Sequence, residues 1–223
     1  MTTTRLEQLV HIPAAGVALE GMLELPEKAQ GVVLFAHGSG SSRHSPRNNY
    51  VARTLRESGA GTLLIDLLTR EEDTNYETRF DIPLLTQRLL SATQWLQHDE
   101  HTKHLLIGYF GASTGAAAAL QAAADKGTAI AAVVSRGGRP DLAGPSALSK
   151  VHSPTLLLVG GFDDVVIELN QQAYERMTCE KQLVIIPGAT HLFEEPGALE
   201  EVARQAALWF SHHLKAAPAG IQP

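Results

Sequence analysis

Apolar and polar residues alternate along the chain in blocks that predict strands and helices in turn. Short apolar runs such as GVVLFAHG and TLLLVG are typical of strands buried on both faces of a sheet. Segments such as DIPLLTQRLLSATQWLQ instead carry apolar residues at the spacing of an amphipathic helix. Because strands and helices alternate with short connections, the pattern predicts a mostly parallel sheet with helices on both faces, an α/β fold.

The predicted elements follow one another without an internal repeat or a linker. A β-hairpin is expected first, from short strands around residues 6–12 and 16–25 that turn residues separate. Further strands are predicted over 31–38, 62–68, 104–110, 129–135, 155–160 and 182–187. Helices are predicted over 50–61, 81–97, 113–127, 166–177 and 194–215, and a flexible tail over 216–223. One domain over residues 1–223 is therefore expected.

Composition and charge narrow the classes of function. Of 223 residues, 44% are hydrophobic and 19% charged, which is typical of a globular protein. A net charge of −6 without a Lys/Arg cluster argues against a nucleic-acid partner. The sequence has no apolar run of the roughly 18–20 residues that span a bilayer and no signal-peptide pattern. With Cys179 as the one cysteine, no internal disulfide can form, and we expect a cytoplasmic protein without membrane association. The sequence does not indicate its oligomeric state.

A five-residue motif between a predicted strand and a predicted helix carries the strongest chemical signal. Residues 111–115 read G-A-S-T-G, a G-x-S-x-G pattern. A turn this sharp strains the central residue, and glycines on either side remove side chains that would collide. Such a turn lifts the Ser113 hydroxyl above the sheet, which predicts Ser113 as a nucleophile. The alternative is that Ser113 only caps the helix.

A nucleophilic serine needs a base, and three histidines lie far enough downstream to serve. His212 and His213 fall within the closing helix, where we expect them to be solvated. His191 lies in the loop IPGATHLFEEPG, which opens at the carboxyl end of the last predicted strand. Because open α/β sheets bind ligands at that edge, His191 is the predicted base.

Two adjacent aspartates compete to orient this base. Asp163 and Asp164 lie just after the strand TLLLVG. The G-x-S-x-G motif, a sharp turn called the elbow, occurs in folds in which the nucleophile comes first along the chain, then the acid, then the histidine. Adjacent residues project differently, so only one is expected to reach His191. The spacing from Gly160 favours Asp163, but a register shifted by one fits Asp164 almost as well. We prefer Asp163 and expect the other aspartate to cap the following helix.

Backbone N–H groups are the expected binding site for an oxyanion. Thr114 offers one at the start of the helix, where unpaired donors favour a negative oxygen. The second is expected from the loop HGSGSS at 37–42, with Ser39 the first choice and Gly38 the second. A dinucleotide-binding loop is a poor alternative, because Arg43 replaces the third glycine and Ser45-Pro46 interrupts the helix start.

Two loops beside the predicted site carry arginines. Arg43 and Arg47 follow the glycine-rich loop, and Arg136 and Arg139 follow the strand at 129–135. A guanidinium above the pocket can pair with an anionic substrate group, and we consider Arg43 and Arg136 for this role. The interpretation that we favour for Arg136 and Arg139 is that they pair with Asp141 or surface carboxylates and hold the loop in place.

No metal or cofactor is predicted. His98, His101 and His104 have a repeated spacing, but they sit in a polar connection between a predicted helix and a buried strand. A solvated connection is the better interpretation, because zinc sites need three or four converging ligands. Acyl transfer through a serine requires no cofactor.

With GYFGASTG, AHGSGSS, VGGFDD and ATHLFEEPG in this order, nearly the whole chain resembles the dienelactone-hydrolase-like branch of the α/β-hydrolases. The resemblance implies an eight-stranded, mostly parallel sheet and no large lid domain. It also implies a triad of Ser113, Asp163 and His191. Dienelactone hydrolases carry cysteine at this turn, whereas this chain has Ser113. Cys179 lies in a polar connection between a predicted helix and a predicted strand and cannot replace it.

This departure at the elbow means that the dienelactone substrate is not carried over with the fold. A small carboxylic ester is the expected partner, cleaved through an acyl-enzyme by a serine esterase. The alternatives are an acyltransferase, or a hydrolase of thioesters or lactones, with the same triad. A protein of this fold that binds a ligand without catalysis is a further alternative.

Overall fold

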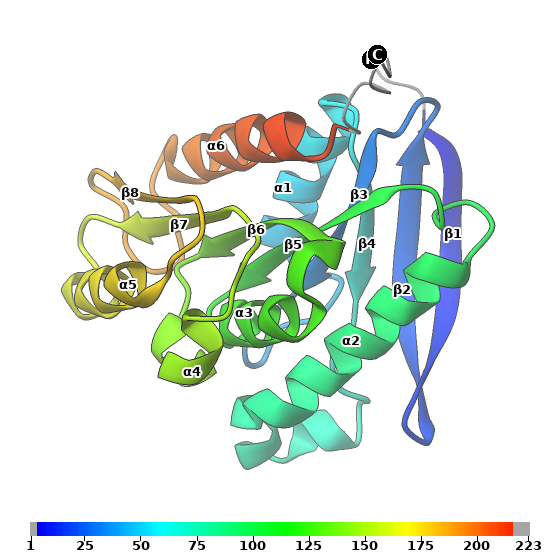
Figure 1. Cartoon of the computed structure of the whole chain (residues 1–223), viewed down its shortest axis with the longest axis horizontal. Helices are drawn as coiled ribbons and strands as arrows, with labels where there is room; N and C mark the ends of the chain where they lie inside the picture. Colours follow the sequence, from blue (N-terminus) through cyan, green and yellow to red (C-terminus); the bar gives the residue numbers. More distant parts are fainter. Residues whose placement is uncertain (1–3, 216–223) are drawn as a thin grey trace, which may run out of the picture.

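A single mixed sheet organises the computed structural model, which describes residues 4–215 (Figure 1). Eight strands run in the order β1-β2-β4-β3-β5-β6-β7-β8. Strands β1 and β2 are antiparallel, β2 is antiparallel to β4, and every other neighbouring pair is parallel. The prediction of an eight-stranded, mostly parallel sheet is therefore confirmed. The strands are β1 (Thr4–Ala14), β2 (Val17–Pro26), β3 (Gly31–Ala36), β4 (Gly61–Ile65), β5 (Leu106–Ala112), β6 (Ile130–Arg136), β7 (Thr155–Gly160) and β8 (Lys181–Ile186).

The predicted N-terminal hairpin is present and closes tightly. Ala14 pairs with Val17, so only Ala15 and Gly16 lie in the turn. Both turn residues have positive φ, 46° and 89°, as two-residue turns of the I′ kind require. The predicted tail at 216–223 lies outside the described residues.

The five long helices fall where the sequence predicted helices. They are α1 (Pro46–Glu57), α2 (Ile82–His98), α3 (Thr114–Lys126), α5 (Asp164–Arg176) and α6 (Ala198–His213). The short helix α4 (Pro145–Leu148) and several 3-10 turns were not predicted, because single turns leave no periodic pattern. The expectation that Ser45-Pro46 interrupts a helix start is wrong. Ser45 caps α1 by accepting a hydrogen bond from the Asn48 N–H, and Pro46 is its first residue, where a missing N–H costs nothing.

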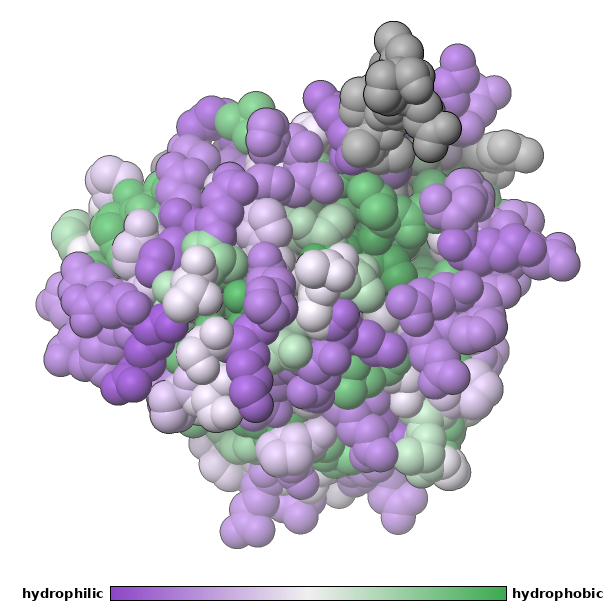
Figure 2. Space-filling view, viewed as in Figure 1, coloured by the Kyte–Doolittle hydropathy of each residue, from purple (hydrophilic) through white to green (hydrophobic). Residues whose placement is uncertain are grey.

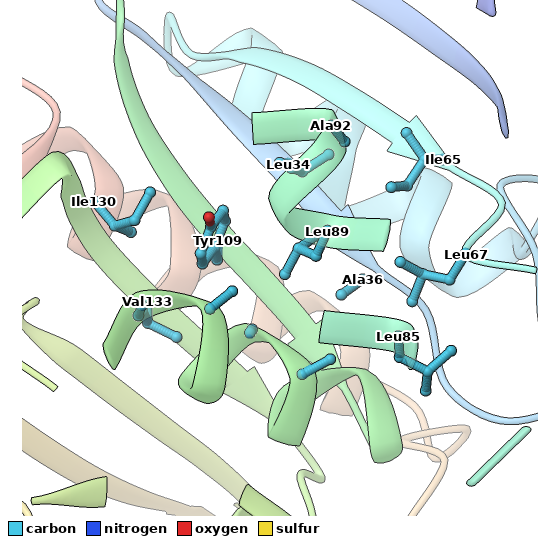
Figure 3. Close-up of a cluster of buried hydrophobic side chains, with 14 of the residues drawn as sticks. Leu34, Ala36, Ile65, Leu67, Leu85, Leu89, Ala92, Tyr109, Ile130 and Val133 are labelled. Atoms are coloured by element: carbon cyan, nitrogen blue, oxygen red, sulfur yellow. The ribbon is translucent and has the colours of Figure 1, made fainter. Parts of the chain in front are cut away.

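Helices cover both faces of the sheet. Helices α1 and α6 pack together on one face, and α2, α3, α4 and α5 lie on the other (Figure 1). Figure 3 shows part of the core on the α2–α3 face, where Tyr109 of β5 lies among Leu89 of α2 and Val133 of β6. The Tyr109 hydroxyl is hydrogen-bonded to Thr93 at 2.6 Å, so the one polar atom of this ring is satisfied.

Six of the seven alanines of α3 are buried, which lets this helix approach the sheet closely beneath the turn at residue 113. Hydrophilic residues cover most of the molecular face seen in Figure 2, with smaller apolar areas between them. Within residues 4–215, none of the helices combines the length and the apolar content needed to cross a membrane.

Candidate active site

The turn between β5 and α3 holds Ser113 in a strained conformation. Its φ and ψ are 50° and −119°, a region that residues other than glycine rarely adopt. Ser113 occupies the cap position of α3, but its side chain makes no capping hydrogen bond. The hydroxyl is therefore not used as a helix cap, and the structure argues against that alternative.

The two glycines of the motif are required by close packing around this turn. A Cβ added at Gly115 would lie 2.5 Å from the His37 carbonyl oxygen and closer still to that of Ala36. A Cβ at Gly111 would lie 2.5 Å from the Ala116 Cα. Side chains at these positions would force α3 away from β3 and β5, so the glycines keep the turn pressed against the sheet.

His191 and Asp163 lie in direct contact although 28 residues separate them. The Nδ1 atom of His191 is 2.6 Å from Oδ2 of Asp163, and the carboxylate side chain is only 16% exposed. Because a carboxylate can only accept, Nδ1 carries the proton and Nε2 is left with a free lone pair. This is the protonation state that a general base needs.

Asp164 does not take part in the pair with His191. It is the first residue of α5 and is exposed, whereas Asp163 occupies the cap position without a capping bond from its side chain. The expectation that the unused aspartate would be the helix cap is therefore wrong. Asp164 contributes a charge to the first turn instead, where a negative charge is favourable.

Ser113 and His191 border one cavity. Its volume is about 220 Å³, and polar side chains dominate its lining. Six of the residues around it are Gly38, Ser39, Arg47, Ser113, Arg136 and His191. Among the described residues no direct hydrogen bond links the Ser113 hydroxyl to His191, a contact that in unliganded hydrolases often tightens only with substrate bound.

The glycine-rich loop after β3 lies against Ser113. A Cβ built at Gly38 would be 3.0 Å from the Ser113 Cβ. The Gly38 carbonyl accepts hydrogen bonds from the Ser41 N–H at 3.1 Å and from His37 Nδ1 at 2.9 Å. A trans peptide points its C=O and N–H in opposite directions, so the Ser39 N–H is turned away from those donors. Ser39 itself lines the cavity.

His37 holds this loop to the segment that follows β4. Its Nδ1–H donates to Gly38, and its Nε2 accepts the Leu67 N–H at 2.9 Å. Burial lowers the pKa of His37 below its ordinary value, which keeps the ring neutral and able to make both bonds.

Thr114 is the first residue of α3, and its N–H has no acceptor within the helix. The helix points its positive end at the cavity from this side. The Ser113 backbone is held from β6, since its N–H donates to the Arg136 carbonyl at 3.2 Å and its C=O accepts from the Arg139 N–H at 3.1 Å.

Arg43 does not reach the cavity that Ser113 borders. Its guanidinium forms ion pairs with Asp66 and with Glu20, and its backbone N–H also donates to Asp66 at 2.7 Å. These contacts hold the glycine-rich loop to the ends of β2 and β4. Arg43 therefore has a structural role, and the structure does not support the hypothesis that it binds substrate in this cavity.

Arg136 and Arg139 behave differently from each other. Arg139 pairs with Asp141 in two hydrogen bonds of 2.8 and 2.7 Å, as predicted. Arg136 lines the cavity with Ser113 and His191, and its Nε and Nη1 atoms are buried without a hydrogen-bond partner among the described residues. The favoured interpretation, pairing with a carboxylate, is wrong for Arg136.

Comparisons with known proteins show the family and the fold of this chain. Residues 19–216 match the Dienelactone hydrolase family. A crystal structure of a dienelactone hydrolase from Anabaena variabilis ATCC 29413 is 57% identical, covers 94% of this chain and 99% of that chain, and superposes with a TM-score of 0.92. Est1E from Butyrivibrio proteoclasticus covers 92% of this chain and 98% of its own with a TM-score of 0.78, but at 18% identity it supports the fold alone.

Relatives from Mycobacterium tuberculosis, whose names assign them provisionally as phosphoribosyl transferases, are 57% identical over 208 residues, which is 93% of this chain. The chain spans 47% of the length of these relatives, so their name describes proteins about twice as long as the shared part. The family match and the Anabaena structure both cover most of this chain. The chain belongs to the dienelactone hydrolase family.

Proposed function

We propose that this protein hydrolyses small carboxylic esters through an acyl-enzyme formed on Ser113. Nε2 of His191 takes the proton from the Ser113 hydroxyl as the oxygen attacks the ester carbonyl. Asp163 holds the imidazole in the required tautomer and stabilises the imidazolium that forms. His191 then gives the proton to the leaving alcohol, and the acyl group stays on Ser113.

The second half of the reaction uses the same groups in reverse. Water loses a proton to His191 and attacks the acyl carbonyl, and the proton returns to Ser113 as the acid leaves. In both halves the negative oxygen is bound by the Thr114 N–H and by a second donor from the loop at 37–42. Ser39 is our choice. The Gly38 carbonyl points at its two donors, Ser41 and His37, and the Ser39 N–H therefore points away from those donors. One such donor is worth roughly 3–4 kcal/mol of barrier.

The single observation that carries the proposal is the 2.6 Å contact between His191 and Asp163 beside the strained Ser113. A serine that only caps a helix needs no strained conformation, and a surface histidine needs no contact with a buried carboxylate. The contact leaves the unprotonated imidazole nitrogen free at a cavity that Ser113 borders. Membership of a hydrolase family supports the same chemistry.

Two alternatives use the same residues. An acyltransferase would pass the acyl group to an alcohol or thiol instead of water, and a thioester or lactone hydrolase would differ in the leaving group. Product analysis with added alcohols and thiols separates these. The transferase name of the longer relatives adds no candidate here, because it belongs to the whole of those proteins.

The test is turnover of p-nitrophenyl acetate by wild-type protein, Ser113→Ala and His191→Ala. We expect both substitutions to reduce kcat/KM by at least about a thousandfold. A fluorophosphonate should label the wild-type protein on Ser113 and leave Ser113→Ala unlabelled. Wild-type turnover by Ser113→Ala would show that the nucleophile is wrong. A protein that neither turns over esters nor is labelled would be a ligand-binding member of the fold.

A further inference from the structure

Asn170 is a fully buried polar residue that the proposed mechanism does not use. It lies on α5 with 0% of its surface exposed. Its Nδ2 donates to the Gly138 carbonyl at 3.0 Å and to the Val166 carbonyl at 2.8 Å. Because both partners are carbonyls, only the amide nitrogen can form these bonds. The bond to Val166 stays within the helix, whereas the bond to Gly138 joins α5 to a distant part of the chain.

The part of the chain that accepts this bond is the loop at 136–139, which also holds Ser113. The Ser113 N–H donates to the Arg136 carbonyl at 3.2 Å, and the Ser113 carbonyl accepts the Arg139 N–H at 3.1 Å. Gly138 lies between the two residues that form these bonds. A shift of the Gly138 peptide would therefore be passed to the strained turn at Ser113.

The same loop packs against the proposed base. A Cβ built at Gly137 would lie 3.2 Å from the His191 carbonyl oxygen and 3.5 Å from Cε1 of its imidazole. Asp163, which contacts this imidazole, occupies the cap position of α5, two turns before Asn170. The three residues of the proposed triad therefore meet at one loop and one helix, and the bond between Gly138 and Asn170 connects that loop to that helix.

From this arrangement we infer that Asn170 is a positioning residue, which sets the place of the loop that holds Ser113 relative to the helix that carries Asp163. The inference rests on the proposed ester hydrolysis at Ser113. Asn170 acts through the backbone and not on the substrate. Proton transfer from Ser113 to His191 depends steeply on their alignment, since a displacement of about 1 Å can cost on the order of a hundredfold in rate.

The first test compares variants of this residue with a matched control. Asn170→Ala removes both hydrogen bonds, and Asn170→Asp replaces the amide with a carboxyl group of the same shape. Thr93→Val is the control, because it removes a buried hydroxyl that donates to the Leu89 carbonyl at 2.8 Å. Thr93 lies on α2, a helix that contributes no residue to the lining of the 220 Å³ cavity.

Turnover of p-nitrophenyl acetate gives kcat and KM, and fluorophosphonate labelling reports the reactivity of Ser113 without deacylation. Rates are divided by the folded fraction from urea unfolding in the same buffer. We expect Asn170→Ala to lower kcat and the labelling rate by about tenfold to a hundredfold, with KM within about threefold of wild type. Thr93→Val should lose stability, while its kcat and labelling rate stay within about threefold of wild type.

Two results of these assays overturn the inference and leave ester hydrolysis intact. One is an Asn170→Ala protein whose kcat and labelling rate equal those of an active wild type. The other is an equal loss of kcat in Thr93→Val, because the effect would then follow from the loss of a buried hydrogen bond anywhere in the fold.

Asn170→Asp adds a pH dependence that a purely structural role would not produce. A protonated carboxyl can donate one hydrogen bond to the Gly138 carbonyl, whereas a carboxylate only accepts and repels that oxygen. Burial raises the pKa of a carboxyl, so the ratio of variant to wild-type kcat should fall between about pH 5 and about pH 9. The ratio for Asn170→Ala should not change with pH. An Asn170→Asp ratio as low as that of Asn170→Ala throughout this range contradicts the inference.

Hydrogen exchange followed by mass spectrometry separates this inference from the proposed function, because it requires no turnover. Segments 111–115 and 136–139 are compared in wild type, Asn170→Ala and Thr93→Val. Faster exchange of both segments in Asn170→Ala alone supports the inference, since the Ser113 and Arg139 N–H groups form the bonds between them. Unchanged exchange shows that the inference is wrong, whatever the esterase assay gives. Faster exchange in a protein with neither turnover nor labelling supports the positioning role and refutes ester hydrolysis.

Discussion

Replacing Arg136 with methionine should make the protein more stable, although most buried substitutions destabilise. Methionine is unbranched and close to arginine in length, so it can fill most of the space of the side-chain stem. It removes the buried charge and the two nitrogens that lack partners. No carboxylate loses its counter-ion, because Arg136 forms no ion pair among the described residues.

The size of the effect follows from the pKa of Arg136. Burial, and secondarily repulsion by Arg47, lowers this pKa well below its ordinary value, to about 10. Each pH unit corresponds to about 1.4 kcal/mol, so the charge costs the folded state about 3 kcal/mol. The unfolded chain holds this proton more tightly than the folded protein does. The cost is therefore complete at neutral pH and is relieved only as the pH rises above about 10.

Urea unfolding at pH 7, followed by tryptophan fluorescence in a buffer without phosphate, measures the change. We expect Arg136→Met to raise the free energy of unfolding by about 1–3 kcal/mol, because imperfect packing offsets part of the gain. Arg204→Met, on the surface of α6, should change it by less than about 0.5 kcal/mol. If Arg136→Met instead lowers the free energy of unfolding by 1 kcal/mol or more at unchanged m, the guanidinium is stabilised in the folded state and the reasoning fails.

Three further predictions concern the turn at Ser113, the two adjacent aspartates and the loop at 37–42. Asp163→Asn should lower kcat/KM for p-nitrophenyl acetate by about a hundredfold or more, whereas Asp164→Asn should stay within threefold of wild type in the same assay. Gly115→Ala should lower the free energy of unfolding by at least about 3 kcal/mol in urea titrations, since its Cβ would collide with the β3 backbone. Stability should fall as the pH drops below 6.5, because the unfolded chain takes up a proton that the folded state, with a lowered His37 pKa, resists. His37→Asn should weaken that dependence in acid titrations of stability.

Features set by local sequence could be predicted well. The alternation of apolar blocks gave the strands and long helices, because period and length reflect burial directly. The elbow at Ser113 could be located because a strand, a five-residue motif and a helix are contiguous in the chain. The pairing of His191 with Asp163 is the contact that the spacing from Gly160 favoured. That spacing fitted Asp164 almost as well, and the fold decides between them because Asp163 contacts His191 whereas Asp164 is exposed at the start of α5.

The roles of the arginines could not be predicted, because they depend on which acids the fold brings near. Asp141 is close to Arg139 in sequence, so their pair was foreseeable. The partners of Arg43 are Glu20 on β2 and Asp66 just after β4, and no local pattern indicates them. For the same reason, the sequence did not indicate that Arg136 would be buried without a carboxylate partner.

The placement of Arg136 on a strand explains why its charge can remain unpaired. Arg43 and Arg139 lie on loops, where a long side chain can adopt a rotamer that contacts a carboxylate. The Arg136 carbonyl accepts the Ser113 N–H, so the residue that carries the buried charge also holds the backbone of the proposed nucleophile. Moving this backbone towards water would disturb the elbow. The charge therefore stays buried at a cost in stability, which the Arg136→Met substitution should relieve.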